Sequence, residues 1–527
     1  MARASARTRR TVLCVFPRYE PSFGTFQYAY PLMAGVKAFM PPQGLLTIAA
    51  YLPAEWEVRF VDENIRPARS DEFRWADMVL VSGMHVQRRQ ILSIARRARA
   101  AGRTCVLGGP SVSAAPDDYA AFDYLHVGEL GDATDALIAR LDADCTPPPE
   151  QVILTTEKRL PLSEFPAPAY GLVEMRRYFL ASIQFSSGCP YQCEFCDIPA
   201  LYGRQPRLKT PQQVLDELDG MRRHGRVHAV YFVDDNFIGN RKAAKDLLPH
   251  LIDWQRRNGY PLEFACEATL NIAKQPDLLA LMREARFCTV FCGVETPELD
   301  ALQAMKKGHN ASLPMLDSIA TLNDYGIEVV SGIILGLDTD TPATGQRILD
   351  FVRSSRIPML TINLLQALPR TPLHDRLRAE GRLDTDPARE SNVVFRQPYD
   401  DVLTTWRRLV AEVFTPDNVY ARFAHHIEHT FPHRFKPPHR DVTAADLRKG
   451  LSVMGRVLWH VGLRADYRAT FWRMAKPLIK AGRIDDLLHV AIVAHHLISF
   501  ARDAVHGRQN ASFYSAKLRE ADRSAAR

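Results

Sequence analysis

The chain is poor in cysteine, with nine cysteines among 527 residues. Six of them are scattered singly, and most of these lie inside apolar runs, as Cys14 and Cys292 do. Isolated cysteines in apolar runs are typical of buried free thiols and not of a disulfide framework. The cysteine usage therefore predicts a protein of a reducing cytoplasm.

The sequence also lacks a long uninterrupted apolar stretch. No run reaches the roughly 18 apolar residues that a membrane-spanning helix requires, and the nearest candidate, residues 487–500, is interrupted by three histidines. The N-terminus, MARASARTRRTVLCVF, is basic and then only briefly apolar. Without a long apolar core or a small-residue cleavage site it does not predict a secretory signal.

Acidic charge is scarce in the last quarter of the chain. The net charge is +7, and from Asp401 onward 21 Lys and Arg stand against 12 Asp and Glu. Ten of the 17 histidines lie in the same region. We therefore expect this quarter to meet surroundings different from those of the rest. The positive charge is diffuse and includes no recognised nucleic-acid module, so we expect no nucleic-acid partner.

Short apolar runs alternate with helical patterns through residues 1–145. Five buried strands are predicted, at TVLCVFP, WEVRFVDE, ADMVLVSG, TCVLGGP and YLHVGE. Strands that alternate with helices indicate a parallel, doubly wound, Rossmann-like sheet, which binds ligands at the carboxyl ends of its strands. A proline-rich linker is predicted over residues 146–178.

A second alternating series fills residues 179–396. Six strands are predicted, at ASIQFSS, HAVYFVDD, LEFACEA, CTVFCGV, IEVVSGIILG and LTINLLQ. Six strand–helix units within about 200 residues favour a partial (β/α)6 barrel over a second Rossmann-like domain. Over residues 397–527 helical patterns dominate. The predicted fold class is therefore α/β, with a mainly helical C-terminal domain.

Three cysteines stand close together, Cys189, Cys193 and Cys196 in SSGCPYQCEFCD. On a helix they would form one small apolar stripe, but Gly188 and Pro190 favour a loop. Thiolates prefer zinc and iron–sulfur clusters. Structural zinc needs a fourth ligand, whereas a four-iron cluster held by three thiolates leaves one iron open. A cluster is favoured, with zinc and simple packing as the alternatives.

The CxxxCxxC spacing, with Phe195 before the last cysteine, resembles the radical S-adenosylmethionine enzymes. The resemblance implies a [4Fe-4S] cluster on Cys189, Cys193 and Cys196, whose open iron binds S-adenosylmethionine. An electron from the cluster then cleaves the sulfonium and releases a 5′-deoxyadenosyl radical, and a reductase, ferredoxin or flavodoxin is the implied electron donor. It also implies cofactor contacts at later strand ends, from Asp234, Asp235, Glu267, Glu295, Gly332, Ile334, Gly336 and Thr341. Taken alone, each acidic residue is more typical of a helix cap or a solvated loop.

A doubly wound domain before such a barrel resembles the cobalamin-binding domain of one radical subgroup. The matching residues follow three predicted strands: Ser82 and Gly83, Gly108 and Gly109, and Gly128 and Glu129. Glycine at a strand end lets a large planar cofactor approach the backbone. Many cobalamin proteins ligate cobalt from a D-x-H-x-x-G sequence, but PRYEPSFGTFQYAY contains no histidine. We therefore expect a lower cobalt face without a histidine ligand, and a polar loop role for His85.

The stretches PRYEPSFGTFQYAYPL, VKAFMPPQGLL and GLDTDTP are similar to the bacterial hopanoid carbon-2 methylases, over residues 12–395. The similarity implies a C-methyltransferase that uses methylcobalamin and S-adenosylmethionine to methylate a hopanoid lipid of the diplopterol type. A saturated carbon has no lone pair, so removal of a hydrogen atom must precede its methylation. The alternatives are another apolar or heterocyclic substrate on the same scaffold, and a cobalamin and iron–sulfur sensor.

The basic segment RATFWRMAKPLIKAGR, residues 468–483, combines cationic, aromatic and apolar side chains. One interpretation is a helical cap over the barrel, with its Lys and Arg in solvent. The other is a contact with anionic lipid headgroups. On the second interpretation the cytoplasmic enzyme would be peripheral on the inner face of the membrane.

Overall fold

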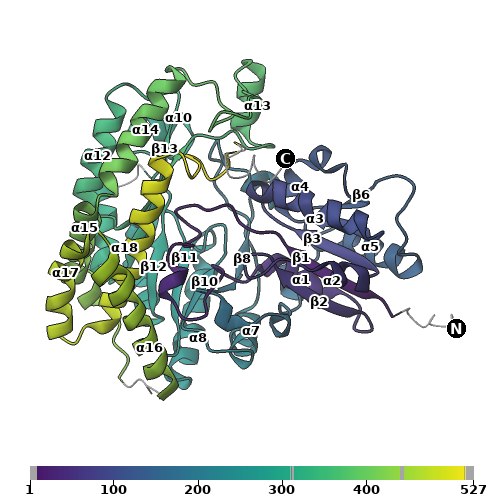
Figure 1. Ribbon diagram of the computed structural model, residues 1–527, viewed down its shortest axis with the longest axis horizontal. Coiled ribbons are helices and arrows are strands. Elements are labelled where there is room, and N and C mark those ends of the chain that lie inside the picture. The colour runs from purple at the N-terminus through teal and green to yellow at the C-terminus, as the bar shows by residue number, and fades with distance from the viewer. Residues whose placement is uncertain (1–8, 309, 311–313, 439–443, 516, 518–527) are drawn as a thin grey trace. The chain divides into compact units, whose positions relative to one another are not determined.

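The computed structural model describes residues 9–308, 310, 314–438, 444–515 and 517 (Figure 1). The chain divides into two compact units. The first unit comprises residues 1–20, 40–189 and 197–227, and the second comprises residues 21–39, 190–196 and 228–527. The loop after the first strand and the loop of Cys193 and Cys196 therefore both belong to the second unit.

The first unit contains a parallel six-stranded sheet in the order β2-β1-β3-β4-β5-β6. Its strands are β1 (Thr11–Phe16), β2 (Glu57–Asp62), β3 (Met78–Ser82), β4 (Thr104–Gly108), β5 (Tyr124–Val127) and β6 (Val152–Thr155). The first five are the predicted strands. β6 lies in the stretch that we predicted to be a linker. It is a half-exposed edge strand between proline-rich flanks, so its sequence lacks the continuous apolar run of a buried strand.

Helices cover both faces of this sheet. Alternate strand residues point to opposite faces, so Leu13 and Val15 enter one core, whereas Val12 and Cys14 enter the other. The first core includes α2 (Ser70–Trp75), α3 (Arg88–Ala100) and α4 (Pro110–Ala114). The second core includes α1 (Gln43–Tyr51) and α5 (Asp132–Ala143). The doubly wound arrangement is as predicted, and the strand order reverses between β1 and β3, which is where such sheets bind ligands.

The second unit contains five parallel strands in the order β14-β13-β12-β11-β10. They are β10 (Ala229–Phe232), β11 (Glu263–Glu267), β12 (Phe287–Phe291), β13 (Glu328–Leu335) and β14 (Met359–Leu364). All five were predicted, and the other predicted strand, ASIQFSS, is β7 (Ala181–Ile183) of the first unit. Helices alternate with the strands: α8 (Arg241–Arg257), α9 (Pro276–Glu284), α10 (Leu299–Ala304), α11 (Met315–Asp324), α12 (Thr344–Ser355) and α13 (Pro372–Ala379).

The last part of the second unit is helical, as predicted. It contains α14 (Tyr399–Val413), α15 (Pro416–His429), α16 (Ala444–Val457), a π-helical turn (Leu458–Arg464), α17 (Arg468–Lys480) and α18 (Ile484–Val505). α18 is longer than the apolar run in the sequence suggested, and among the described helices it alone has the length and composition of a membrane span. Most of its apolar window is buried, because α18 packs against α14, α15, α16 and α17.

An ion pair is fully enclosed in the first unit. Lys209 follows β9 (Arg207–Leu208), and its ammonium contacts the carboxylate of Glu217 on α7 (Pro211–Arg223). The two side chains are 1% and 2% exposed. Burial raises the pKa of Glu217 above its ordinary value. The positive charge of Lys209 therefore offsets the free-energy cost of burying the Glu217 carboxylate.

We expect Lys209→Met to destabilise the protein by about 3–5 kcal/mol, because Glu217 is left buried without a counter-charge. Urea unfolding of the first unit, monitored by hydrogen exchange of its amides, measures this loss of stability. Replacing both partners, as Lys209→Met with Glu217→Leu, is expected to restore most of the stability. Arg176→Met is the matched control, because Arg176 pairs at the surface of the same unit with the exposed Glu174. An equal loss in both single variants would contradict this account.

Candidate active site

Cys193 and Cys196 lie on a short loop of the second unit, not on a helix. The backbone N–H of Glu194 donates to the carbonyl oxygen of Met305 at 3.0 Å, and the carbonyl oxygen of Glu194 accepts from the N–H of Leu373 at 2.9 Å. The N–H of Cys196 donates to the carbonyl oxygen of Cys193 at 3.1 Å. Both thiols are half-buried. The apolar-stripe alternative required a helix, so the loop removes it.

Cys189 ends a segment of the first unit. Its N–H donates to the carbonyl oxygen of Gly203 at 3.2 Å. Gly188, just before it, has φ +100°, and a Cβ there would lie 3.0 Å from the same carbonyl oxygen. The local backbone therefore requires glycine. Among the described residues no group of three or more His, Cys, Asp and Glu side chains is placed to hold a metal. The assignment of the three cysteines as ligands stays a prediction.

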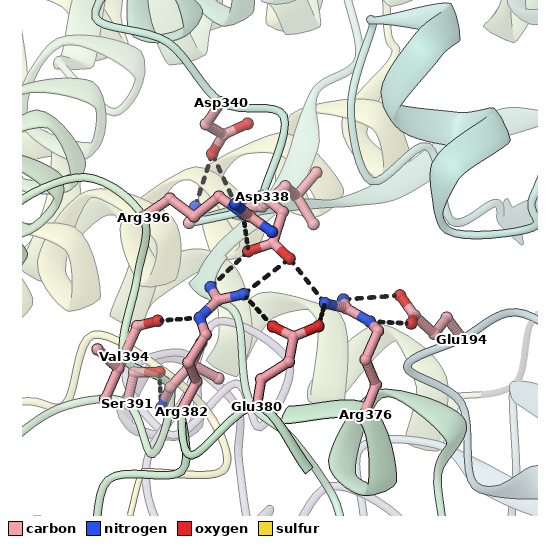
Figure 2. Close-up of polar contacts among 12 residues, drawn as sticks. Glu194, Asp338, Asp340, Arg376, Glu380, Arg382, Ser391, Val394 and Arg396 are labelled. Carbon is pink, nitrogen blue, oxygen red and sulfur yellow. Dashed lines mark hydrogen bonds and ion pairs between the residues drawn. The ribbon is translucent and has the colours of Figure 1, made fainter. Parts of the chain in front are cut away.

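The side chain of Glu194, between the two loop cysteines, is held by arginine (Figure 2). Nε and one terminal nitrogen of Arg376 on α13 contact its two carboxylate oxygens at 2.6 and 3.2 Å. Arg376 also donates to Asp338 at 2.8 Å, and Arg382 donates to Asp338 at 2.6 Å. Glu380 accepts from both arginines. The loop is thus tied to the segment after β13 through a connected set of charges.

Asp338 is ionised in this network. Its partial burial opposes ionisation, but the hydrogen bonds from Arg382 and Arg376 outweigh that effect and lower its pKa to about 2. Asp340, two residues on, accepts from the N–H groups of Gly336 and Leu337 at 2.7 and 3.0 Å. Burial raises the pKa of Asp340 to about 6 in spite of these bonds. The two aspartates therefore differ in charge state at slightly acidic pH.

Gly332 and Gly336, both predicted site residues, lie on β13 and just after it. Gly336 has φ +97°, and a Cβ there would lie 2.5 Å from the ring of Phe395. A Cβ at Gly332 would lie 3.2 Å from the hydroxyl of Thr361. Thr341 lies before α12, where its N–H donates to Thr344 and its hydroxyl accepts from Arg347. At Gly332 and Gly336 the neighbouring side chains of the protein therefore already explain why the residue is glycine.

The predicted carboxylates gather at the ends of neighbouring strands. Asp234 and Asp235 follow β10, and Glu267 ends β11. Glu295 follows β12. Burial, followed by the charge of Asp235 and then of Asp234 and Glu295, raises the pKa of Glu267 to about 7. The phenol of Tyr231 donates to Glu267 at 3.4 Å and moderates the shift. Asp234, Asp235 and Glu295 are therefore near enough for their charges to act on Glu267, and we call these four carboxylates the acidic group; their contacts with a cofactor stay a prediction.

Lys307 is a site residue that the sequence did not reveal. Its ammonium contacts the carboxylate of Glu295 and lies 5.5 Å from the centre of the Phe195 ring. Burial opposes its charge, but the charges of Glu295, Cys193 and Cys196 together raise the pKa of Lys307. In the sequence it follows Lys306 and looks like an ordinary solvated pair. No local pattern marks it, because its partners come from distant segments.

Glu295 itself is fixed by its backbone. It has φ +66°, which is unusual for a residue with a side chain. Its N–H donates to the carbonyl oxygen of Gly332, and its carbonyl oxygen accepts from the N–H of Ile334, both at 2.8 Å. A Cβ at Gly293 would lie 2.2 Å from the Glu295 carboxylate. Such strain, held by surrounding hydrogen bonds, is typical of a functional site.

The predicted cobalamin residues lie at the carboxyl ends of β3, β4 and β5 in the first unit. A Cβ at Gly83 would lie 2.8 Å from Pro17, and one at Gly109, where φ is +92°, would lie 2.4 Å from the hydroxyl oxygen of Ser82. These two glycines are therefore required by the chain's own packing. At Gly108 a Cβ would meet only ordinary contacts, the nearest at 3.8 Å. This position leaves the room that a cofactor approaching the strand ends would use.

Gly128 and Glu129 follow β5. Gly128 has φ +109°, and a Cβ there would lie 3.0 Å from Thr156. The carboxylate of Glu129 accepts from Arg207 at 2.5 Å and from the hydroxyl of Ser187 at 3.2 Å, and it pairs with Arg159 at 3.2 Å. Glu129 thus orients the segment that leads to Cys189.

The stretch PRYEPSFGTFQYAY, which contains no histidine, is residues 17–30, and from Pro21 onward it belongs to the second unit. The ring of Phe23 lies 4.6 Å from Phe414 and 4.4 Å from Phe500. A ring nitrogen of His496 on α18 lies 3.0 Å from the carbonyl oxygen of Phe23. The side chain of Phe23 therefore packs among aromatic residues of the second unit. His85 is half-buried, and burial lowers its pKa, which favours the neutral imidazole.

Three family models match successive parts of the chain. The B12 binding domain matches residues 31–138, the Radical SAM superfamily matches residues 183–352, and a domain of unknown function, DUF4070, matches residues 371–510. The B12 binding range includes β3, β4 and β5 with the glycines that follow them. The Radical SAM range includes the three cysteines and the four carboxylates. Both domains were predicted from the sequence, and the matches confirm them.

The chain is 59% identical to the hopanoid C-2 methylase of Rhodopseudomonas palustris (strain TIE-1), over 99% of each chain. It is 34% identical to an uncharacterized methyltransferase of Synechocystis sp., over 92% of this chain and 90% of that protein. Its fold resembles that of the cobalamin-dependent S-adenosylmethionine radical enzyme OxsB, with a TM-score of 0.59 at 14% identity over 94% of this chain and 80% of that one. The predicted fold class is thereby confirmed.

The raised pKa of Glu267 makes stability depend on pH. The pKa of Glu267 in the folded protein, about 7, lies above the ordinary value of 4.5, so ionisation of Glu267 destabilises the fold. This destabilisation reaches its full size above pH 7 and disappears as the pH falls toward 4.5. Glu267→Gln is therefore expected to be more stable than the parent protein above pH 7. The gain is about 1–3 kcal/mol, since residual exposure screens the charge.

Urea unfolding between pH 5 and pH 8 checks this gain, and Tyr231→Phe sharpens the comparison. That variant keeps the carboxylate but removes a hydrogen bond to it, so its pH-dependent step is expected to move to higher pH. A constant difference between Glu267→Gln and the parent at every pH would show that Glu267 is not perturbed.

Proposed function

Because the chain belongs to the cobalamin-dependent radical S-adenosylmethionine methylases, we propose that it methylates carbon 2 of a hopanoid lipid. The enzyme class is C-methyltransferase, and its cofactors are a [4Fe-4S] cluster, S-adenosylmethionine and cobalamin. The observation that carries the substrate assignment is the high identity to a hopanoid C-2 methylase along the full length of both chains. The likeness includes the helical C-terminal part, where the sequence offers no motif of its own.

In this proposal Cys189, Cys193 and Cys196 hold the cluster. Thiolates are suitable iron ligands, and the ammonium of Lys307 favours the thiolate form of Cys193 and Cys196 electrostatically. The Glu194 contacts with Arg376 fix the loop between two of the ligands. When bound, the cofactors would supply two things: a carbon-centred radical that removes a hydrogen atom from the substrate, and the methyl group that the resulting substrate carbon takes up.

The acidic group formed by Asp234, Asp235 and Glu267 would bind the positively charged part of S-adenosylmethionine. Burial and the charges of Asp235 and Asp234 raise the pKa of Glu267, and a cation that binds here would offset the repulsion among the three carboxylates. Glu267, with a pKa of about 7, would lose its proton on binding. We place the adenosine moiety near Gly332 and Gly336, at the end of β13 and the loop that follows it.

Cobalamin would lie at the carboxyl ends of β3, β4 and β5, beside Ser82, Gly83, Gly108, Gly109, Gly128 and Glu129. Gly108 is the position among these glycines where the packing leaves clear room. The stretch after β1 contains no histidine, and His85 is half-buried, so we propose a lower cobalt face without a histidine ligand. The protein's part in the reaction is to hold the three cofactors and to exclude water.

The substrate and the electron donor set the surroundings in which the enzyme works. A hopanoid resides in a membrane, so we propose a cytoplasmic enzyme that is peripheral on the inner face of the cytoplasmic membrane. A reductase, ferredoxin or flavodoxin would deliver the electron. The described residues place the one helix of membrane-spanning composition, α18, in the packed interior of the second unit, which agrees with a peripheral enzyme.

Cys193→Ala is expected to abolish the reductive cleavage of S-adenosylmethionine to 5′-deoxyadenosine and to lower the iron content of anaerobically purified protein. The reason is that two thiolates do not hold a cluster that three would share. Cys288→Ala is the matched control, since Cys288 is another half-buried free cysteine of the second unit. Cleavage that persists in Cys193→Ala would refute the radical mechanism.

Deleting the gene from a bacterium that makes methylated hopanoids is expected to remove the 2-methylated lipids and to leave their unmethylated parents. Mass spectrometry of total lipid extracts measures both, and complementation with the parent gene should restore the methylated lipids, whereas the Cys193→Ala gene should not. If 2-methylated hopanoids persist in the deletion strain, the substrate is another apolar or heterocyclic molecule. A parent protein that neither cleaves S-adenosylmethionine nor is required for the methylated lipids would favour the sensor alternative.

A further inference from the structure

Large apolar side chains are exposed on one face of α16 and of the π-helical turn that follows it. Leu447, Leu451, Trp459 and Leu463 are exposed by 60%, 65%, 51% and 60%. They follow one another at intervals of four or eight residues, so they line one side of a continuous helical segment. Exposed apolar side chains that recur along one face mark an interaction surface. We call these four residues the α16 face.

The other side of the same segment is packed inside the second unit. Val453, Val457 and Val461 are 8%, 0% and 0% exposed, and α16 contacts α18. A guanidinium nitrogen of Arg456 donates to the carbonyl oxygen of Pro31 at 3.2 Å. The segment is therefore firmly held, and the exposure of the α16 face does not come from a frayed helix.

Positive charge accompanies the exposed apolar residues. Residues 444–464 contain Arg448, Lys449, Arg456 and Arg464 against the single acidic residue Asp446, which gives a net charge of +3. The guanidinium of Arg464 lies 5.0 Å from the centre of the Trp459 ring. Tryptophan beside a cation is suited to the boundary between lipid headgroups and acyl chains, where the ring is partly apolar and partly hydrated.

The segment that the sequence suggested for lipid contact, residues 468–483, is built differently. In α17 the apolar side chains of Phe471, Ala475 and Leu478 are buried, at 0%, 0% and 4% exposed. The indole of Trp472 donates to the carbonyl oxygen of Gly462. These three side chains therefore pack within the helical part of the second unit and are not available to lipid.

We propose that the α16 face binds the surface of a bilayer that contains anionic phospholipid. The inference rests on the proposed function, because a hopanoid acceptor brings the enzyme to a membrane. Leucine and tryptophan side chains would insert among the headgroups, and the neighbouring Arg and Lys would attract the negative lipid charge. A second copy of the chain is a poorer fit, since two such faces would bring like charges together.

The direct test is the sedimentation of the anaerobically purified full-length protein with vesicles of phosphatidylcholine and phosphatidylglycerol. The double variant Leu451→Ser with Trp459→Ser is expected to lower the partition coefficient by about tenfold or more. Arg448→Gln with Arg464→Gln is expected to weaken binding to these vesicles, and to reduce its salt dependence, more than it changes binding to pure phosphatidylcholine. Leu299→Ser is the matched control, because Leu299 is 56% exposed on α10, outside the α16 face.

The proposal is overturned if the parent protein does not sediment with the anionic vesicles, or if the Leu451→Ser and Trp459→Ser variant binds them as the parent does. It is also overturned if sedimentation velocity shows a parent dimer that this variant converts to a monomer while vesicle binding is unchanged. That result would make the α16 face an interface between two copies.

Methylation of a hopanoid in detergent micelles separates this inference from the proposed function. The Leu451→Ser and Trp459→Ser variant is expected to keep the parent rate there, because its substitutions lie on the surface and detergent delivers the substrate. Parent protein that methylates the micellar lipid but does not bind vesicles would refute the α16 face alone. Vesicle binding that depends on the α16 face, without methylation of any hopanoid, would support the face and refute the substrate.

Discussion

The Glu194–Arg376 ion pair fixes the loop on which Cys193 and Cys196 lie, and the candidate active site depends on that loop. The loop forms no helix or strand, so its position is set by two backbone hydrogen bonds of Glu194 and by its carboxylate. Arg376 is in turn shared with Asp338, whose charge is held by Arg382 as well. Ligands of a metal cluster must be placed in advance by such supporting contacts, because the chain segment itself is short.

Charge around the loop is arranged in two parts. Four carboxylates gather at the ends of β10, β11 and β12, and Lys307 balances one of them, Glu295, beside Phe195. A buried carboxyl such as that of Glu267, with its pKa raised to about 7, costs stability when it is ionised and is typical of a site that binds a cation. The lysine instead lies where the thiolates of Cys193 and Cys196 favour its charge. The separation of these charges is what makes the second unit suitable for a cationic cofactor beside an anionic cluster.

The sequence was sufficient where local pattern determines structure. Buried strands were predicted from continuous apolar runs, and the loop of Cys193 and Cys196 from the neighbouring glycine and proline. Strand β6 was missed because an edge strand is half exposed, and Lys307 because its partners are distant in the chain. The partners of Glu129 are likewise distant, and the packing of Phe23 with Phe500 spans almost the whole sequence. Such contacts depend on tertiary structure, which a single sequence does not encode as a local pattern.

Electron paramagnetic resonance of the reduced, anaerobically purified protein, recorded with and without S-adenosylmethionine, tests the central claim most directly. A four-iron cluster with one iron open to the cofactor predicts a [4Fe-4S] signal whose g values shift when S-adenosylmethionine is added, with about four irons per chain by elemental analysis. Zinc in place of iron would contradict the account. So would a cluster signal that S-adenosylmethionine leaves unchanged.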